Sequence, residues 1–164
     1  AVTAFLPLYL TREAGLTSNM ASLLFSSLFA VSLIQLFTGE VSDRVGALPI
    51  LALTLGVASV GLGSIVVLSG VGGPLALGAA VVCLGLGAHG YRPVRGAYLM
   101  SVIPASVAGG SLGVVRTLLL IAGASSPALV GYISETAGFR PAFWLLTAAF
   151  VVATVLSVVL WVFE

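Results

Sequence analysis

Residues 39–46 read Gly-Glu-Val-Ser-Asp-Arg-Val-Gly, and this stretch carries three charges within five positions of a very apolar chain. Long apolar runs lie on both sides of it. Charged groups avoid the hydrocarbon core of a membrane, so we expect the stretch to be an aqueous loop between two membrane-spanning helices. Its pattern is G-x-x-x-D-R-x-G, with Gly39, Asp43, Arg44 and Gly46 at the fixed positions.

The composition independently indicates a membrane protein. The 164 residues are 60% hydrophobic and 7% charged, and the mean hydropathy is +1.24. The chain has far more apolar surface than a water-soluble domain of this size could bury. We therefore expect membrane lipid to be a partner. The net charge of +1 gives no reason to expect nucleic acid as a partner.

Six apolar segments, separated by short polar connections, predict an all-α polytopic membrane helix bundle. A full span needs about 20 residues to cross roughly 30 Å of hydrocarbon. The first segment is half that length, so we expect it to be the tail of a truncated helix. The connections are too short for a folded module outside the membrane, so we expect residues 1–164 to be a single transmembrane helical domain. The expected segments are about 1–10, 19–38, 47–69, 75–100, 109–133 and 141–163.

The pattern of residues 39–46 closely resembles the loop signature of the major facilitator superfamily of transporters, which joins the second and third helices of each six-helix half. Residues 93–104 resemble the inner end of the fourth helix of such a half. Residues 123–131 and 138–143 resemble its kinked fifth helix and the entry to the sixth. The resemblance implies that the 39–46 loop is cytoplasmic, together with the connection at 101–108.

The resemblance further implies one half of a twelve-helix secondary active transporter, which moves a small solute by alternating access. Residues Ala47-Leu48-Pro49 stand where the N-terminal copy of the loop usually has basic residues. This favours the C-terminal half, because the two halves are parallel repeats. The missing N-terminal half of the same transporter is then a partner. We expect a multi-pass protein of the cell (cytoplasmic) membrane.

Polar residues inside the spans are costly in hydrocarbon and therefore mark candidate functional positions. With the fourth helix centred near Ala88, His89 and Tyr91 are expected near the midplane. Arg92 is then about 6 Å, and Arg95 about 11 Å, closer to the cytoplasm. A fifth candidate, Arg116, is expected at roughly 7 Å on the same side.

These intramembrane arginines outnumber the acids on their side of the membrane. Arg44 competes for Glu40 and Asp43, so at least one arginine is left without a partner within this chain. Arg95 is the expected partner of Asp43 in a structural latch, as the resemblance also implies.

Arg92 and Arg116 then remain to attract an anionic or carboxylate-bearing substrate. The alternatives are ion pairs with acids of the missing half, or side chains that reach the inner membrane interface.

His89, Gln35 and Tyr91 are also candidate substrate contacts, and the first two have two interpretations each. His89 has an ordinary pKa of about 6.5 and is either a proton site or a hydrogen-bonded packing residue. Gln35 either bonds across helices or touches solute. Tyr91, near the midplane, is grouped with them.

Small residues and a proline predict how the helices meet and move. Gly109 and Gly113, like Gly123 and Gly131, are spaced by four residues or a multiple of four, which favours close helix packing. Pro127 removes a backbone hydrogen bond in the middle of a helix and permits a kink. Ser125 and Ser126 are available to satisfy the freed carbonyls.

Two alternatives belong to other classes of protein. Ser125 or Ser126 with His89 is the basis for an intramembrane serine-type hydrolase, but Pro127 follows Ser126 and no acid is available to orient the histidine. The other alternative is an accessory membrane protein derived from a transporter half. One His and one Cys make no metal cluster, and no G-x-x-x-x-G-K motif occurs. We therefore expect a protein that is not an enzyme and has no cofactor.

Overall fold

The computed structural model describes residues 1–104 and 108–164, and the chain is 89% helical. No strand occurs in these two described ranges, which confirms the expected all-α bundle. The expected connection at 101–108 lies partly outside them. The elements are α1 (Val2–Arg12), α2 (Ser18–Ala30), the 3₁₀ helix η1 (Val31–Leu33), α3 (Ile34–Val45), α4 (Ala47–Leu68), α5 (Pro74–Val102), α6 (Ala108–Thr136) and α7 (Phe139–Phe163).

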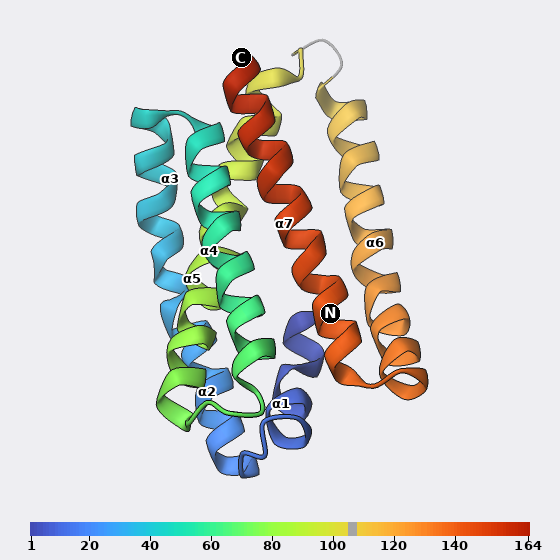
Figure 1. Cartoon of the computed structure of the whole chain (residues 1–164). Coiled ribbons are helices and arrows are strands. Elements are labelled where there is room, and N and C mark those ends of the chain that lie inside the picture. Colours follow the sequence, from blue (N-terminus) through green and yellow to red (C-terminus); the bar gives the residue numbers. More distant parts are fainter. Residues whose placement is uncertain (105–107) are drawn as a thin grey trace.

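The helices run up and down along one common axis (Figure 1). The α3–α4 turn at Gly46 and the C-terminus lie at one end of the bundle, called here the Gly46 end. The α1–α2 and α6–α7 turns lie at the opposite end, called the Gly138 end. In the described part of the chain, five helical segments are long and apolar enough to cross a membrane, with α2, η1 and α3 counted as one span over Ser18–Val45. Helix α1 covers only the part of the bundle near the Gly138 end (Figure 1).

The charged stretch at 39–46 differs from the expected loop, because α3 continues through it to Val45. The chain turns only at Gly46, where φ is 103° and a residue without Cβ is favoured. Arg44 forms an ion pair with Glu40 one helical turn earlier, at 2.5 Å, which supports the helix. The charges therefore sit on a helix end that projects from the apolar part of the span.

The second segment also differs from the single helix expected over 19–38. Thr17 caps its start and accepts a hydrogen bond from the Met20 amide at 3.3 Å. The α-helix is then interrupted by η1 at Val31–Leu33 and resumes as α3. A 3₁₀ turn inside a long helix changes the hydrogen-bonding partners of the local backbone.

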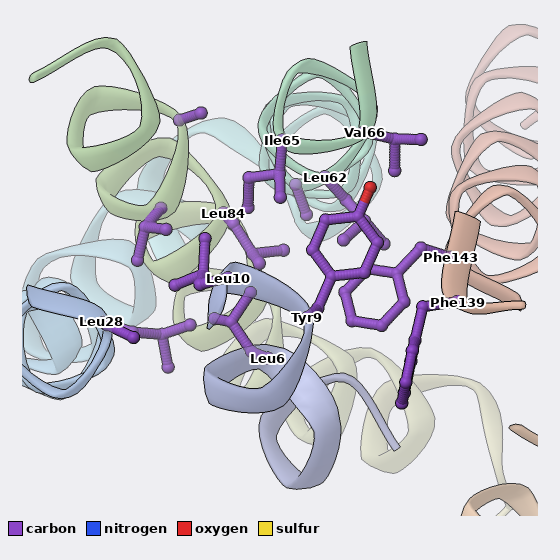
Figure 2. Packing of buried hydrophobic residues seen from close by; sticks show 14 residues of the cluster. Leu6, Tyr9, Leu10, Leu28, Leu62, Ile65, Val66, Leu84, Phe139 and Phe143 are labelled. Atoms are coloured by element: carbon purple, nitrogen blue, oxygen red, sulfur yellow. The ribbon is translucent and has the colours of Figure 1, made fainter. Parts of the chain in front are cut away.

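The core near the Gly138 end gathers around α1 (Figure 2). Leu6, Tyr9 and Leu10 are fully buried, and the Tyr9 ring stacks on Phe143 of α7 with centroids 4.0 Å apart. The spacing i, i+3, i+4 of the three α1 residues puts them on one helix face. This face packs α1 into a core shared with α2, α4, α5 and α7.

Helices α4 and α5 meet with almost no side chain between their backbones. A Cβ added to Gly61 of α4 would overlap the backbone of Leu84, and one added to Gly87 of α5 would overlap the backbone of Ala58. By contrast, the described structure has nothing within 4 Å of a Cβ placed at Gly109, Gly113 or Gly123. Close helix packing therefore depends on Gly61 and Gly87, and not on the regularly spaced glycines of α6.

Candidate functional site

His89 lies next to the midpoint of α5 and is almost completely buried, with 4% of its surface exposed. Its ring packs against Phe29 of α2, with ring centroids 5.9 Å apart. The Nδ1 atom has no hydrogen-bond partner among the residues that the structure describes. A buried ring nitrogen without a partner is costly in an apolar bundle. Both interpretations of His89, as a proton site and as a packing residue, stay predictions.

Gln35 makes a local hydrogen bond near the interruption in the second span. Its Nε2 atom donates to the carbonyl oxygen of Ser32 in η1 at 3.0 Å. The Ser32 carbonyl lies where the helix changes from the α to the 3₁₀ pattern of hydrogen bonds. The Gln35 amide gives this carbonyl a donor. The side chain is half-buried.

Arg92 and Arg116 are both exposed on the surface of the bundle. Within residues 1–104 and 108–164, neither guanidinium group lies within 4.0 Å of a carboxylate. Arg92 follows His89 by three positions, so the two side chains lie on the same side of α5. Arg116 lies on α6, a helix that packs against α7.

Arg95 has a different environment from the other two intramembrane arginines. Its guanidinium lies over the Tyr91 ring, 5.5 Å from the ring centroid, as in a cation–π contact. Both residues line a pocket of about 450 Å³ between α4, α5 and α7. The other lining residues are almost all apolar: Leu51, Leu55, Leu146, Ala149, Phe150, Ala153, Leu156 and Ser157.

The expected latch between Asp43 and Arg95 is not formed in this structure. In the described part of the chain the ion pair is Arg44 with Glu40, and both of these side chains are largely exposed, at 75% and 63%. Arg95 instead lies against Tyr91. For a state with a closed cytoplasmic side, the latch stays a prediction.

Pro127 lies inside α6, and the helix continues through it to Thr136. Because proline has no N–H, the carbonyl of Gly123 four residues earlier loses its helical donor. The Ser126 hydroxyl donates to this same carbonyl at 3.2 Å. Ser126 therefore has the role that its position next to Pro127 predicts.

A group of contacts at the Gly138 end was missed in the sequence. Tyr9 lies within hydrogen-bonding distance of Ser69, and Arg140 donates to the Val66 carbonyl at 3.2 Å. Arg12 lies over the Phe139 ring at 5.9 Å. The i, i+3, i+4 spacing of Leu6, Tyr9 and Leu10 was the signal in the sequence for a buried α1 face, but no spacing indicates which hydroxyl it meets.

The family model for the Major Facilitator Superfamily matches residues 1–164, which is the whole of the chain. The chain belongs to this superfamily. The match confirms the resemblance first seen in residues 39–46, although most of that stretch is helical. No curated protein matches the chain. The chain belongs to this superfamily, and five of its described helical segments could cross a membrane. It is therefore a multi-pass membrane protein.

Proposed function

We propose that the chain is part of a secondary active transporter that moves a small solute across the cell (cytoplasmic) membrane by alternating access. The match to the superfamily along the entire chain carries this proposal. Among the described residues, the short α1 and the five long apolar segments support it, since each half of such a transporter is a bundle of this kind.

The chain is the C-terminal half, and a six-helix N-terminal half completes the transporter. One structural feature supports a longer first helix. Residues of α1 pack among α4, α5 and α7 near the Gly138 end, and the 450 Å³ pocket lies between the same three helices. Leu146 and Phe150 border both the α1 core and the pocket. A helix that extends α1 toward the Gly46 end would fill this groove.

The transported solute is an anion. Arg92 and Arg116 are exposed and have no carboxylate partner in the described part of the chain. A guanidinium at membrane depth is stabilised by an anion, and a partly desolvated contact of this kind is strong. These two side chains therefore attract solute of negative charge into the space between the halves.

The experiment compares uptake of an anion and of a neutral solute of similar shape by the complete transporter in liposomes. Benzoate and benzamide are one such pair, and succinate and succinamide are another. Arg92→Gln and Arg116→Gln should each lower uptake of the anion much more than uptake of the neutral partner. Arg12→Gln is the matched control, because it removes one positive charge at the Gly138 end. Equal losses for anion and neutral solute would contradict the anion preference, whereas absence of any solute flux would contradict the transporter itself.

The serine-type hydrolase is not favoured by the geometry. Ser126 bonds to the backbone of its own helix, and no hydrogen bond joins Ser125 or Ser126 to His89 among the described residues. The His89 ring packs against Phe29 of α2. A catalytic nucleophile and its general base must lie within hydrogen-bonding distance of each other, or close to it.

A further inference from the structure

The interruption of the second span lies at the middle of the membrane-spanning bundle. The 28 residues of Ser18–Val45 have Val31–Leu33 at their centre. The centre of α5 (Pro74–Val102) is Ala88, next to His89. The irregular segment and the buried histidine therefore lie at a similar depth, on helices that contact one another.

Helix α5 approaches the irregular segment closely because Gly85 has no side chain. A Cβ at Gly85 would lie 2.6 Å from Cγ2 of Val31 and 3.0 Å from the carbonyl oxygen of Leu28. These distances are too short for a real side chain. His89 follows Gly85 by one helical turn, so it lies on the same face of α5, toward α2 and η1.

The polar groups around this contact are unequally satisfied. The Ser32 carbonyl receives the Gln35 amide at 3.0 Å. The Nδ1 atom of His89 has no partner among the described residues, and Phe29 covers the ring with its own ring centroid 5.9 Å away. Arg92, one turn further along α5, is exposed and without a carboxylate partner in the described ranges.

Irregular backbone at membrane depth is stable only where protein covers it or where it borders a space that polar groups enter. In transporters, interrupted helices at the midplane often form the binding site for solute or ion. Here a 3₁₀ turn inside a span lies beside a helix that carries a histidine nitrogen and an arginine, both without partners among the described residues.

We propose that His89 and Arg92, beside the interruption at Val31–Leu33, bind the anionic group of the transported solute, and that Phe29 covers this site. This site rests on the proposed transport function, and its residues are the contacts of the transported anion. A carboxylate or phosphate accepts a hydrogen bond from the Nδ1–H tautomer of His89 and a charge-assisted bond from the Arg92 guanidinium. Bending of the second span at η1 moves Phe29 aside and admits the anion.

The test measures whether a charged reagent reaches this position and prefers one sign of charge. In the complete transporter, Cys83→Ser and serine at any cysteine outside residues 1–164 remove the native thiols, and His89→Cys places one thiol at the site. A membrane-impermeant anionic methanethiosulfonate, carrying a sulfonate, is compared with its trimethylammonium counterpart. The anionic reagent should react at least about ten-fold faster, because Arg92 raises the local concentration of anions. Arg92→Gln should remove most of this preference.

Two further variants test whether position 89 is accessible to solute or is simply part of the packed protein interior. Phe29→Ala should speed the reaction of the His89→Cys thiol, because it removes the cover. Val81→Cys is the matched control, since Val81 is a fully buried residue two turns earlier on α5 and should stay unreactive. The proposal is overturned if the His89→Cys thiol reacts with neither reagent, or if both reagents react equally with Arg92 intact.

Solute flux distinguishes the failure of this site from the failure of the proposed function. Histidine is also replaced by phenylalanine, which retains a ring against Phe29 but has no polar atom. The His89→Phe variant should have a raised KM for the transported anion. If flux and KM stay at the wild-type level, transport stands and the site is wrong. If the complete wild-type protein moves no solute, the function itself is wrong.

Discussion

The hydroxyl groups of Tyr9 and Ser69 lie 3.0 Å apart inside the bundle, although 60 residues separate them in the chain. Tyr9 belongs to α1, and Ser69 directly follows α4. The Ser69 hydroxyl also bonds to the Val66 carbonyl at 2.8 Å. This short hydrogen-bonded chain fixes the end of α1 to the end of α4.

Tyr9→Phe should destabilise the protein by about 1 kcal/mol, because it removes this buried hydrogen bond and keeps the stacked ring. The measurement is thermal unfolding of the detergent-solubilised protein. Tyr132→Phe is the control, since Tyr132 is 67% exposed and should tolerate the change. Equal melting temperatures for the wild type and the Tyr9→Phe variant would show that the bond adds no stability.

Gly87→Ala should impair folding strongly, because the new methyl group meets the backbone of Thr54 and Ala58. Backbone atoms cannot move aside as a flexible side chain does, so α4 and α5 must separate. Gly96→Ala on the same helix is the matched control, with nothing within 4 Å of its Cβ in the described structure. The yield of monodisperse protein after solubilisation measures both variants. A normal yield of Gly87→Ala would mean that the two helices lie further apart.

Asp43→Asn should impair transport and leave membrane insertion intact, because the latch with Arg95 needs the charge of the carboxylate. The latch concerns the state in which the cytoplasmic side is closed. Initial transport rates in liposomes, at matched protein incorporation, measure the effect. Glu40→Gln is a useful comparison. It also removes an acidic charge, but from an exposed ion pair with Arg44, so it should change the transport rate little. A fully active Asp43→Asn variant would refute the latch.

Ser126→Ala and Ser125→Ala should leave transport largely intact, because the expected role of these serines is to satisfy backbone near Pro127. Ser126→Ala should cause a small loss of stability, since the Gly123 carbonyl loses its donor. Pro127→Ala restores the N–H at that point, so Ser126→Ala should cost less stability in its presence. Thermal unfolding of the four proteins in this double-mutant cycle gives the coupling. Loss of a hydrolytic activity in either serine variant would reopen the enzyme interpretation.

The sequence predicted the helical bundle well, because length and apolarity alone determine where a chain can cross lipid. The helical state of residues 39–45 was not predicted, because three charges suggested a loop. On a helix end outside the hydrocarbon, an ion pair such as Arg44 with Glu40 stabilises the helix instead.

The interruption at η1 had no signal of its own. Residues Ala30-Val31-Ser32-Leu33 contain neither glycine nor proline, the usual causes of a helix break. The close contact at Gly85 comes from a helix more than 50 positions later in the chain, so no local pattern contains it. For the same reason, the sequence identified His89 and Gln35 as polar residues at depth but not that both lie beside this interruption.

Arg140, in the first turn of α7, donates a hydrogen bond to the Val66 carbonyl near the end of α4, at 3.2 Å. The acceptor is a backbone atom, so a substitution of the Val66 side chain leaves it in place. A shift of α4 along its axis would instead move the acceptor away from the guanidinium. The contact therefore depends on the position of the α4 backbone and not on the side chain at position 66.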